Sequence, residues 1–271
     1  MSKYREVVHS LTTKYGTTIW SKMLQGIRRF NLISPNDKIA VCLSGGKDSF
    51  ILAVLLQMYQ AYIDKSVEVK IIMMDPGYDK DNLQIVLDNI KTLDLDVHVF
   101  KTNIFEIVEN TKSPCYGCAK KRRGALYDEA MKLGCNKIAL GHHFNDIIET
   151  TLIAQFYTGK IETMVPKLKS TGHPGMELIR PLCLVEEDNI ISAWNYNEMQ
   201  FITCACVVTK KASCDSGESK RKVIKLLIKE LKKDNPSIEL NIFNCTSNIY
   251  LGKVMGYVDK SDNKISFLDE Y

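Results

Sequence analysis

The sequence predicts an α/β protein with a Rossmann-like parallel sheet, helices on both faces of the sheet, and helical N- and C-terminal extensions. Between residues 38 and 182, short apolar runs typical of buried strands alternate with longer runs that are apolar at helical spacing. A glycine-rich loop joins the first strand-like run to the first helix. With 271 residues, the chain is long enough to bury a core within one large domain. We expect a helical lead-in over 1–35, the α/β domain over 36–206, and a basic helix with a tail over 207–271.

Five apolar runs predict the strands of the sheet. They read KIAVCLS, VEVKIIMMD, DVHVFKT, CNKIALGHH and MELIRPL, at residues 38–44, 67–75, 96–102, 135–143 and 176–182. Stretches of helical periodicity separate these runs and predict helices over 5–30, 50–62, 78–93, 122–134, 146–159 and 219–234. A short further strand is expected at 200–202, ahead of a less legible C-terminal region.

Charge and hydropathy narrow the class of protein. The opening residues MSKYREVVHS are polar and unlike a signal peptide, and no apolar run approaches the roughly 20 residues of a membrane helix. We therefore expect a cytoplasmic protein with no membrane partner. The net charge of +4 is mild, but basic residues cluster in KKRRG at 120–124 and again over 219–233. These two stretches are either solvated helix faces or contacts to nucleic-acid phosphates.

The loop SGGKDS, Ser44–Ser49, is typical of a phosphate cradle. Its glycines allow the backbone to approach a ligand closely, and the helix N-terminus behind them attracts anions. Its lysine adds a positive charge and its two serines add hydroxyl donors. Its aspartate repels phosphate unless it serves a cation or the helix end. The spacing excludes the nucleoside-triphosphatase P-loop, which has four residues between its glycines and then Gly-Lys-Ser/Thr.

Polar residues also follow two other predicted strands. Asp75-Pro76-Gly77 ends the second strand, and Gly141-His142-His143 ends the fourth, with Asp146 close behind. Ligands of open α/β sheets bind outside the carboxyl ends of the strands. We therefore expect these two sets and the glycine loop to converge on one crevice.

Four of the nine cysteines have spacings that suit a metal site. Cys115 and Cys118 form a C-x-x-C pair, whose sulfurs can share one metal atom or cluster or act as a redox pair. Cys204 and Cys206 are the obvious complement. Three or four thiolates fit zinc or an iron–sulfur cluster, and spacing alone leaves both open.

The remaining cysteines and the histidine pair are less informative. Cys42, Cys135 and Cys183 lie in apolar runs and are interpreted as core residues. Cys214 and Cys245 stay undecided. His142 and His143 lie beside the expected crevice, as a polar lining or as structural hydrogen-bonding groups, and are not assigned to a metal.

The motifs together resemble a known family. SGGKDS resembles the PP-loop of the ATP-pyrophosphatase superfamily, whose members split ATP between its α- and β-phosphates. With SPCYGCAKKRRGALY (113–127), the run over 136–168 and IRPL (179–182), the chain resembles the tRNA 2-thiocytidine synthetase (TtcA-type) family of iron–sulfur-dependent tRNA thiolases. The resemblance covers roughly residues 22 to 250 and is strong through 41–182.

This resemblance implies a PP-loop (HUP-type) fold and an enzyme that works on tRNA. It would adenylate the 2-oxo group of a pyrimidine, cytidine in the anticodon loop, and replace AMP with sulfur. ATP, Mg²⁺ and a 4Fe-4S cluster are the implied cofactors. The residues implied in ATP binding are Ser44, Gly45, Gly46, Lys47, Asp48, Ser49, Asp75 and Gly141.

The resemblance also implies three catalytic residues. Lys47 would steady the leaving pyrophosphate, and Asp146 would serve a metal or acid–base step. Arg122, one helical turn after Cys118, would stabilise transition-state charge or, as an alternative, contact a tRNA phosphate.

The resemblance also implies the cluster ligands. Cys115 and Cys118 would bind two irons and Cys204 a third, with Cys206 as its rival. Relatives have a proline–cysteine stretch and a second C-x-x-C at that place, whereas this chain reads Thr-Cys-Ala-Cys.

The implied partners are tRNA and a sulfur donor, either a cysteine desulfurase or free sulfide; a homodimer stays open. The residues expected to contact tRNA are Lys120, Lys121, Arg123, Lys220 and Arg221. Two other functions remain open at this point: a thiolase for a tRNA uridine, and a PP-loop ligase with structural zinc and no sulfur transfer. A catalytically idle zinc-stabilised tRNA-binding module conflicts with the intact SGGKDS loop.

Overall fold

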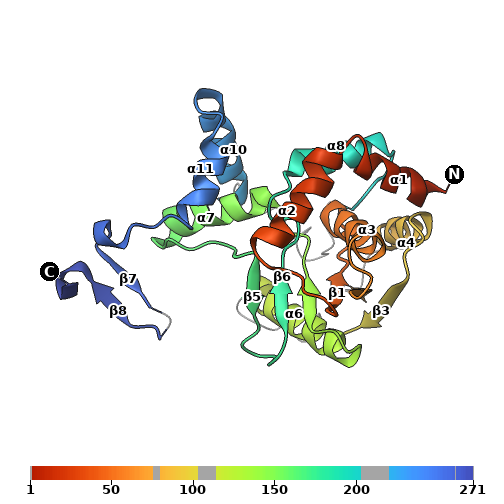
Figure 1. The fold of residues 1–271 in the computed structure, drawn as a ribbon, viewed down its shortest axis with the longest axis horizontal. Helices are drawn as coiled ribbons and strands as arrows, with labels where there is room; N and C mark the ends of the chain where they lie inside the picture. The colour runs from red at the N-terminus through yellow and green to blue at the C-terminus, as the bar shows by residue number, and fades with distance from the viewer. Residues whose placement is uncertain (1, 76–79, 103–113, 203–219, 260, 271) are drawn as a thin grey trace. The chain divides into compact units, whose positions relative to one another are not determined.

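Six strands form one sheet in the computed structural model of the chain (Figure 1). The structure describes residues 2–75, 80–102, 114–202, 220–259 and 261–270, with only the backbone of 114–120. The strand order is β3-β2-β1-β4-β6-β5, and all neighbours are parallel except β5 and β6, which are antiparallel. The strands are β1 (Lys38–Cys42), β2 (Glu68–Asp75), β3 (Val97–Lys101), β4 (Lys137–Ala139), β5 (Lys167–Lys169) and β6 (Glu177–Ile179). The expected α/β class and parallel sheet are confirmed.

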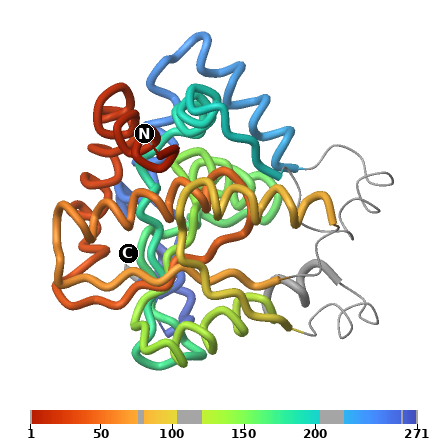
Figure 2. The backbone as a smooth tube through the Cα atoms, turned by 90° about the vertical axis from the view of Figure 1, so that its right-hand side faces the viewer, coloured from red at the N-terminus to blue at the C-terminus, as the bar shows by residue number. Residues whose placement is uncertain are grey.

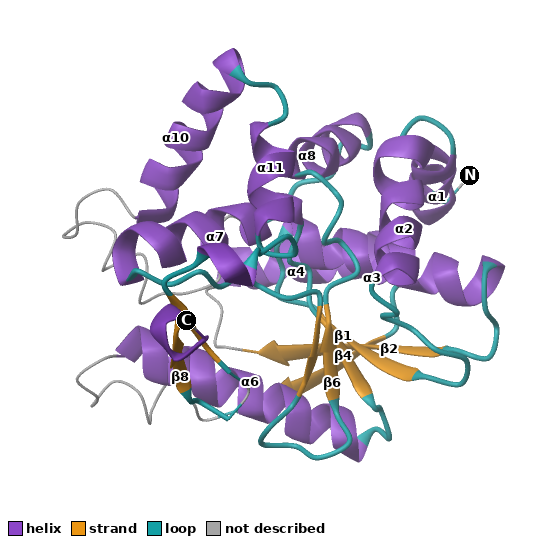
Figure 3. Ribbon diagram, turned by 60° about the vertical axis from the view of Figure 1, so that its left-hand side comes forward, coloured by secondary structure: helices purple, strands orange, loops and turns teal. Residues whose placement is uncertain are grey.

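Alternate residues of each strand face opposite sides of the sheet and enter two cores. Ile39 and Val41 of β1 belong to the larger core, while Ala40 and Cys42 belong to the smaller one. The larger core contains helices α3 (Lys47–Tyr62), α4 (Lys80–Thr92) and α8 (Glu187–Tyr196). The smaller core contains α6 (Pro114–Lys132). Figure 3 shows α6 on one face of the sheet and α3 and α4 on the other.

The helical lead-in packs on the larger core. It consists of α1 (Lys3–Thr12), a π-helical turn η1 (Gly16–Trp20) and α2 (Ser21–Arg29). Val7, Leu11, Ile19 and Met23 of the lead-in are buried there. The Tyr15 hydroxyl donates to the Ser192 carbonyl oxygen at 2.8 Å, which ties the lead-in to α8. Figure 2 shows the red backbone of the lead-in beside the teal backbone of α8.

A buried ion cluster lies at the amino ends of the central strands. Lys137 is 3% exposed, and its ammonium contacts Asp37 Oδ2 at 2.9 Å and Glu177 Oε2 at 3.0 Å. It also donates to the Leu32 carbonyl oxygen at 2.9 Å. Because Leu32 follows the lead-in, this cluster fixes the end of the lead-in to β4 and β6.

The chain divides into two compact units. Unit 1 comprises residues 1–147 and 165–218, and unit 2 comprises 148–164 and 219–271. Helix α7 (Phe144–Thr158) begins in unit 1 and continues into unit 2. The other elements of unit 2 are α10 (Lys220–Asp234), α11 (Ile238–Cys245), η2 (Leu251–Lys253), β7 (Gly256–Val258), β8 (Lys264–Ser266) and η3 (Phe267–Glu270).

Three features differ from the sequence-based expectation. Residues 200–202 were expected to form a short strand, but they are irregular, and Ile202 packs instead on the glycine loop. The edge strand β5 and helices α8 and α11 were not predicted. β5 has only three residues, too few for a period to be read from sequence.

No helix within the described ranges is both long enough and apolar enough to span a membrane.

Candidate nucleotide site

The loop between β1 and α3 has a backbone that requires glycine. Gly45 has φ of +86°, in the left-handed region that side chains disfavour. A Cβ there would lie 2.7 Å from Ile202 Cδ1 and 2.9 Å from Val86 Cγ2. The loop is therefore held from outside by α4 and by the segment that leads into residue 203.

Ser49 closes the loop onto the start of α3. Its hydroxyl donates to the Gly46 carbonyl oxygen at 2.8 Å and accepts the Ser44 N–H at 3.1 Å. The Ser44 hydroxyl also donates to Ser49 Oγ at 3.2 Å. Since α3 begins at Lys47, its first N–H groups and positive dipole end face this loop, an arrangement that suits an anion.

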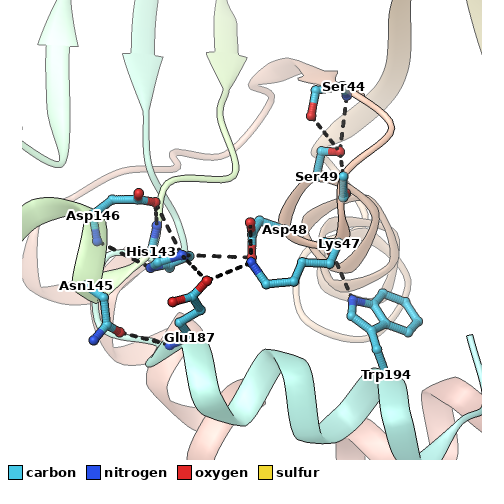
Figure 4. Close-up of polar contacts among 10 residues, drawn as sticks. Ser44, Lys47, Asp48, Ser49, His143, Asn145, Asp146, Glu187 and Trp194 are labelled. Atoms are coloured by element: carbon cyan, nitrogen blue, oxygen red, sulfur yellow. Dashed lines mark hydrogen bonds and ion pairs between the residues drawn. The ribbon is translucent and has the colours of Figure 1, made fainter. Parts of the chain in front are cut away.

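Lys47 lies between two carboxylates (Figure 4). Its ammonium contacts Asp48 Oδ2 and Glu187 Oε1, each at 3.0 Å. Burial lowers the pKa of Lys47, but the two carboxylates raise it, and the net pKa lies above its ordinary value. The Trp194 indole N–H donates to the Lys47 carbonyl oxygen at 2.9 Å. Helix α8 therefore holds both the side chain and the backbone of this lysine.

His143 lies close to three carboxylates of this site. It is 4% exposed, and its Nε2 lies 3.5 Å from Asp146 Oδ2 and 4.0 Å from both Asp48 Oδ1 and Glu187 Oε1. Asp146 also accepts the His143 backbone N–H at 3.0 Å. Within the described part of the chain, the buried Oδ1 of Asp48 has no hydrogen-bond donor. That oxygen is suited to a cation.

Gly141 brings the end of β4 against the start of α3. A Cβ at Gly141 would lie 2.9 Å from the backbone carbon and oxygen of Asp48 and 3.0 Å from the nitrogen of Ser49. Backbone atoms cannot move aside as a flexible side chain can. The glycine is thus needed for close approach of two chain segments, whatever its role toward ATP.

A cavity of about 320 Å³ opens at the carboxyl ends of the strands; we call it the loop cavity. It brings together residues from β1, α3, β2, α6 and α7 and from the segments that follow β1 and β4. They are Cys42, Leu43, Ser44, Asp48, Ser49, Met74, Arg122, Leu126, Leu140, Gly141, His142 and Asp146. Two of the three expected polar sets therefore meet, and Arg122 joins them. Asp75 ends β2 as expected, but it does not line this cavity, and neither do Gly45, Gly46 and Lys47.

Arg180 is a buried cation beside this cavity. It is 8% exposed, and burial lowers its pKa to about 10. Its Nε donates to His142 Nδ1 at 3.3 Å, and its Nη1 donates to the Val165 carbonyl oxygen. None of the described carboxylates forms a salt bridge with it.

Three cysteines are buried as the sequence predicts. Burial raises the pKa of Cys42 and of Cys135, and it raises the pKa of Cys183 to about 12. These side chains therefore stay neutral thiols, which disfavours metal binding. Cys245 is exposed in unit 2, and its thiol donates to the Ile242 carbonyl oxygen at 3.0 Å.

The expected cluster ligands lie outside the described side chains. Cys115 and Cys118 are in the first turns of α6, where only the backbone is described. Cys204, Cys206 and Cys214 fall in the undescribed range 203–219. In the remainder of the chain, no group of three or more His, Cys, Asp and Glu side chains is placed to hold a metal ion.

The residues expected to contact tRNA lie in both units. Lys121 and Arg123 are exposed on α6, and Lys120 lies beside them on that helix. In unit 2, Lys220 lies 4.8 Å from the ring centre of Tyr157. Arg221 pairs with the buried Glu149 at 3.2 Å. Arg221 therefore also anchors α10 to α7.

Glu187, Trp194 and Arg180 belong to the site but were not singled out from the sequence. A signal for Glu187 was present, because Glu186, Glu187 and Asp188 follow IRPL directly and acidic residues mark a helix start. No sequence signal links Trp194 to Lys47, which lies 147 residues earlier.

Comparison with known proteins identifies similar chains. The family model of the PP-loop domain matches residues 17–206. A tRNA-cytidine(32) 2-sulfurtransferase of Citrifermentans bemidjiense is 33% identical over 238 residues, covering 86% of this chain and 91% of that protein. One of Geotalea daltonii with the same name is 35% identical over 236 residues, covering 85% and 91%.

A solved structure has a similar fold. It is the U34-tRNA thiolase NcsA of Methanococcus maripaludis with its 4Fe-4S cluster, at a TM-score of 0.65 and 20% identity. The match covers 85% of this chain and 79% of that one. At this identity, the likeness concerns the fold.

Proposed function

We propose an activity from this premise: the chain belongs to the PP-loop family and, within it, to the family of the tRNA-cytidine(32) 2-sulfurtransferases. The protein is an ATP-dependent tRNA sulfurtransferase. It adenylates the 2-oxo group of a cytidine in the anticodon loop, releases pyrophosphate, and exchanges AMP for sulfur. The named relatives act on tRNA cytidine, which favours cytidine over uridine as the base.

The loop cavity is the observation that carries this proposal. On one wall, the Ser44–Ser49 loop leads into the N-terminus of α3, whose first backbone N–H groups and positive dipole end suit phosphates. Arg122 of α6, the helix that begins with the C-x-x-C pair, lines the same cavity. The cavity proposed for the nucleotide is thus lined by the same helix that carries Cys115 and Cys118, two candidate ligands of the cluster.

Adenylation makes the base reactive. A carbonyl oxygen is a poor leaving group, whereas AMP is a good one. The base O2 attacks the α-phosphorus, and pyrophosphate leaves toward the Ser44–Ser49 loop, where the Lys47 ammonium neutralises it. Arg122, which makes no hydrogen bond or ion pair within the described part of the chain, stabilises charge on the transferring phosphoryl group.

Mg²⁺ fits the carboxylates of the loop cavity. The buried Asp48 Oδ1, to which no described residue donates a hydrogen bond, and the nearby Asp146 provide the oxygen ligands that this ion prefers. The ion would neutralise phosphate charge when bound. Glu187, His143 and Lys47 lie around these carboxylates and keep them oriented.

An iron–sulfur cluster fits the cysteines that remain. The three buried cysteines are kept as neutral thiols, which leaves Cys115, Cys118 and the cysteines after residue 202 in unit 1. Ile202 packs on Gly45, and Cys204 follows Ile202 by two residues in the sequence, which favours Cys204 as the third ligand. Cys206 is the next choice for the third ligand.

When bound, the cluster would supply an open iron to carry the incoming sulfur. Hydrosulfide then displaces AMP from carbon 2, which leaves a thiocarbonyl, AMP and a proton. The sulfur comes from a cysteine desulfurase or from free sulfide. Lys120, Lys121 and Arg123 on α6, with Lys220 and Arg221 on α10, contact the tRNA backbone. Because its proposed substrate is tRNA, we expect the enzyme in the cytoplasm.

Labelled ATP tests this function directly. With γ-labelled ATP and tRNA, the purified protein should release labelled pyrophosphate and unlabelled AMP. With sulfide added under anaerobic conditions, the tRNA should gain 2-thiocytidine. Primary release of ADP and free phosphate would refute the proposal. An adenylated product without sulfur, made by a colourless zinc protein, would instead identify a PP-loop ligase.

A further inference from the structure

A second cavity lies between α6 and the sheet; we call it the α6 cavity. Its volume is about 280 Å³, and its floor is apolar. Ile138 of β4 and Leu178 of β6 form the floor; they are paired in register, and each is 1% exposed. The volume is just below the roughly 300–1,000 Å³ of most small-molecule sites, and one flat ring fits within it.

The opposite wall is formed by two successive stripes of α6. Arg122 and Leu126 form one stripe and Arg123 and Tyr127 the other, each pair one helical turn apart. His173 stacks on Tyr127 at a ring distance of 4.7 Å and an interplanar angle of 13°. His173 is itself held by Asp128, whose Oδ1 lies 3.0 Å from His173 Nε2. The aromatic wall is therefore fixed before any ligand arrives.

The α6 cavity adjoins the loop cavity. Arg122, Leu126 and Leu140 line both, so a group in one space lies next to a group in the other. The loop cavity has the phosphate-binding donors, whereas the α6 cavity has an apolar floor with two guanidiniums beside it. This division of polarity matches a nucleotide on one side and a base on the other.

We propose that the α6 cavity receives the pyrimidine base that is to be modified, turned out of the anticodon loop. This inference rests on the proposed function. Enzymes that do chemistry on a base remove it from its stack and hold it against apolar and aromatic side chains. Here the partly exposed Leu126 and Leu140 would contact the ring, backed by the buried Ile138, Leu178 and Tyr127. The base O2 would then point past Arg122 toward the α-phosphate.

The charged groups of this cavity also favour cytosine. Arg122 and Arg123 have only hydrogen-bond donors. Cytosine presents two acceptors side by side, O2 and N3, whereas uracil presents O2 and an N3–H donor. A guanidinium that faces O2 and N3 can donate to both atoms of cytosine but meets the N–H of uracil. The cavity itself thus discriminates between the two pyrimidines.

Photo-crosslinking of the wild-type protein tests the placement of the base. The probe is an anticodon stem–loop RNA with 5-iodocytidine at position 32, the position in the names of the relatives. After irradiation and digestion, the crosslinked peptides should contain α6 residues 122–127 or the strand segments around Ile138 and Leu178. Crosslinks confined to other segments would overturn the inference.

A substitution that fills the α6 cavity provides the second test. Leu178→Phe should lower kcat/KM for RNA-dependent pyrophosphate release about tenfold or more, since the base no longer fits. The Kd for ATP and the Kd for the RNA should change little. Leu168→Phe is the control, because Leu168 is paired with Leu178 in β5 but is 46% exposed and lines neither cavity. A Leu178→Phe enzyme with wild-type turnover would contradict the proposal.

The two tests separate this inference from the proposed function. Crosslinking measures binding and needs no turnover, so it also decides the matter if Leu178→Phe fails to fold. If the wild type releases no pyrophosphate with tRNA, the proposed function fails even where crosslinks map to the α6 cavity. If the wild type is active and its crosslinks lie elsewhere, only the base site is wrong.

Discussion

At the residue scale, Lys47 shows how one side chain of the glycine loop depends on groups far away in the sequence. Its ammonium lies between Asp48 and Glu187, and its carbonyl oxygen accepts a hydrogen bond from Trp194. Two of these three partners come from α8, more than 130 residues later. Glu187 is thus a positioning residue, since it acts through Lys47 and His143.

Removal of Glu187 should therefore lower the rate more than it weakens ATP binding. We expect Glu187→Ala to reduce kcat for pyrophosphate release substantially, because a misplacement of about 1 Å can cost about 100-fold. Glu187→Gln, which can still accept from Lys47, should restore part of the rate. The control is Glu186→Ala, at an exposed neighbouring position. Equal rates for all three variants would exclude a positioning role.

The cysteines differ in their ability to ionise. Cys115→Ala, Cys118→Ala and the third-ligand variant should bleach the anaerobically reconstituted protein and abolish thiolation. Cys183→Ala should keep the brown colour, because burial holds that thiol neutral with a pKa of about 12. Absorbance near the visible iron–sulfur bands measures this. If the Cys204→Ala and Cys206→Ala proteins both keep full colour, neither residue is the third ligand, and Cys214 becomes the candidate.

At the scale of elements, glycine decides how closely two segments approach. Gly141 at the end of β4 touches the backbone of α3 at its first turn. Loop and strand end together form the polar wall of the loop cavity. A single methyl group at this place would separate them.

Gly141→Ala should lower both stability and ATP affinity. Overpacking against backbone costs about 1–3 kcal/mol, and the displaced α3 N-terminus would hold phosphate less well. Gly172→Ala is the control, since a Cβ there meets no atom within 4 Å. Chemical denaturation and ATP titration provide the two readouts. An unchanged Kd for ATP in a destabilised Gly141→Ala protein would show that the contact is structural only.

The Lys137 cluster attaches the lead-in to the sheet and should make stability depend on pH. Burial lowers the pKa of Lys137, but Asp37 and Glu177 raise it to a net value above the ordinary one. The ammonium therefore stabilises the fold fully below the unfolded-state pKa of about 10.4, and this contribution is lost as pH rises through the higher folded-state pKa.

Replacing the buried Lys137 should lower the free energy of unfolding far more than replacing the more exposed Lys167. We expect Lys137→Met to lower the free energy of unfolding by about 3–5 kcal/mol at neutral pH, because it leaves Asp37 buried without its cation. Lys167→Met, whose ammonium is partly exposed and 3.2 Å from Glu177, should cost about 1 kcal/mol or less. Urea denaturation at neutral and alkaline pH measures both. Similar losses for the two variants would contradict a special role for the buried cation.

At the scale of the whole molecule, the basic residues are distributed over both units. Lys121 and Arg123 are exposed on α6 of unit 1, and the lysines of α10 are exposed in unit 2. The net charge is only +4, because acidic residues elsewhere in the chain offset the charge of these basic residues. The contacts expected with tRNA are therefore local and electrostatic.

Binding of tRNA should consequently weaken steeply with salt. Between low and physiological salt we expect about a tenfold or greater loss of affinity. Lys121→Glu with Arg123→Glu should flatten the salt dependence and raise the Kd for tRNA, while the Kd for ATP stays the same. Lys264→Glu, in the β7–β8 hairpin, is the control. A salt-insensitive complex would identify the basic stretches as solvated faces.

The α/β class, the glycine loop, the C-x-x-C pair and the buried cysteines could all be predicted from the amino-acid sequence. Alternation of apolar runs and the demands of glycine are local properties, so they can be read without knowledge of distant contacts. The tertiary structure alone decided that Glu187 and Trp194 hold Lys47, that Arg180 is buried beside His142, and that Ile202 packs on Gly45 instead of forming a strand. It also decided that two cavities share Arg122. These features arise where parallel strands and their helices bring distant residues to one edge of the sheet, and no local pattern encodes such a meeting.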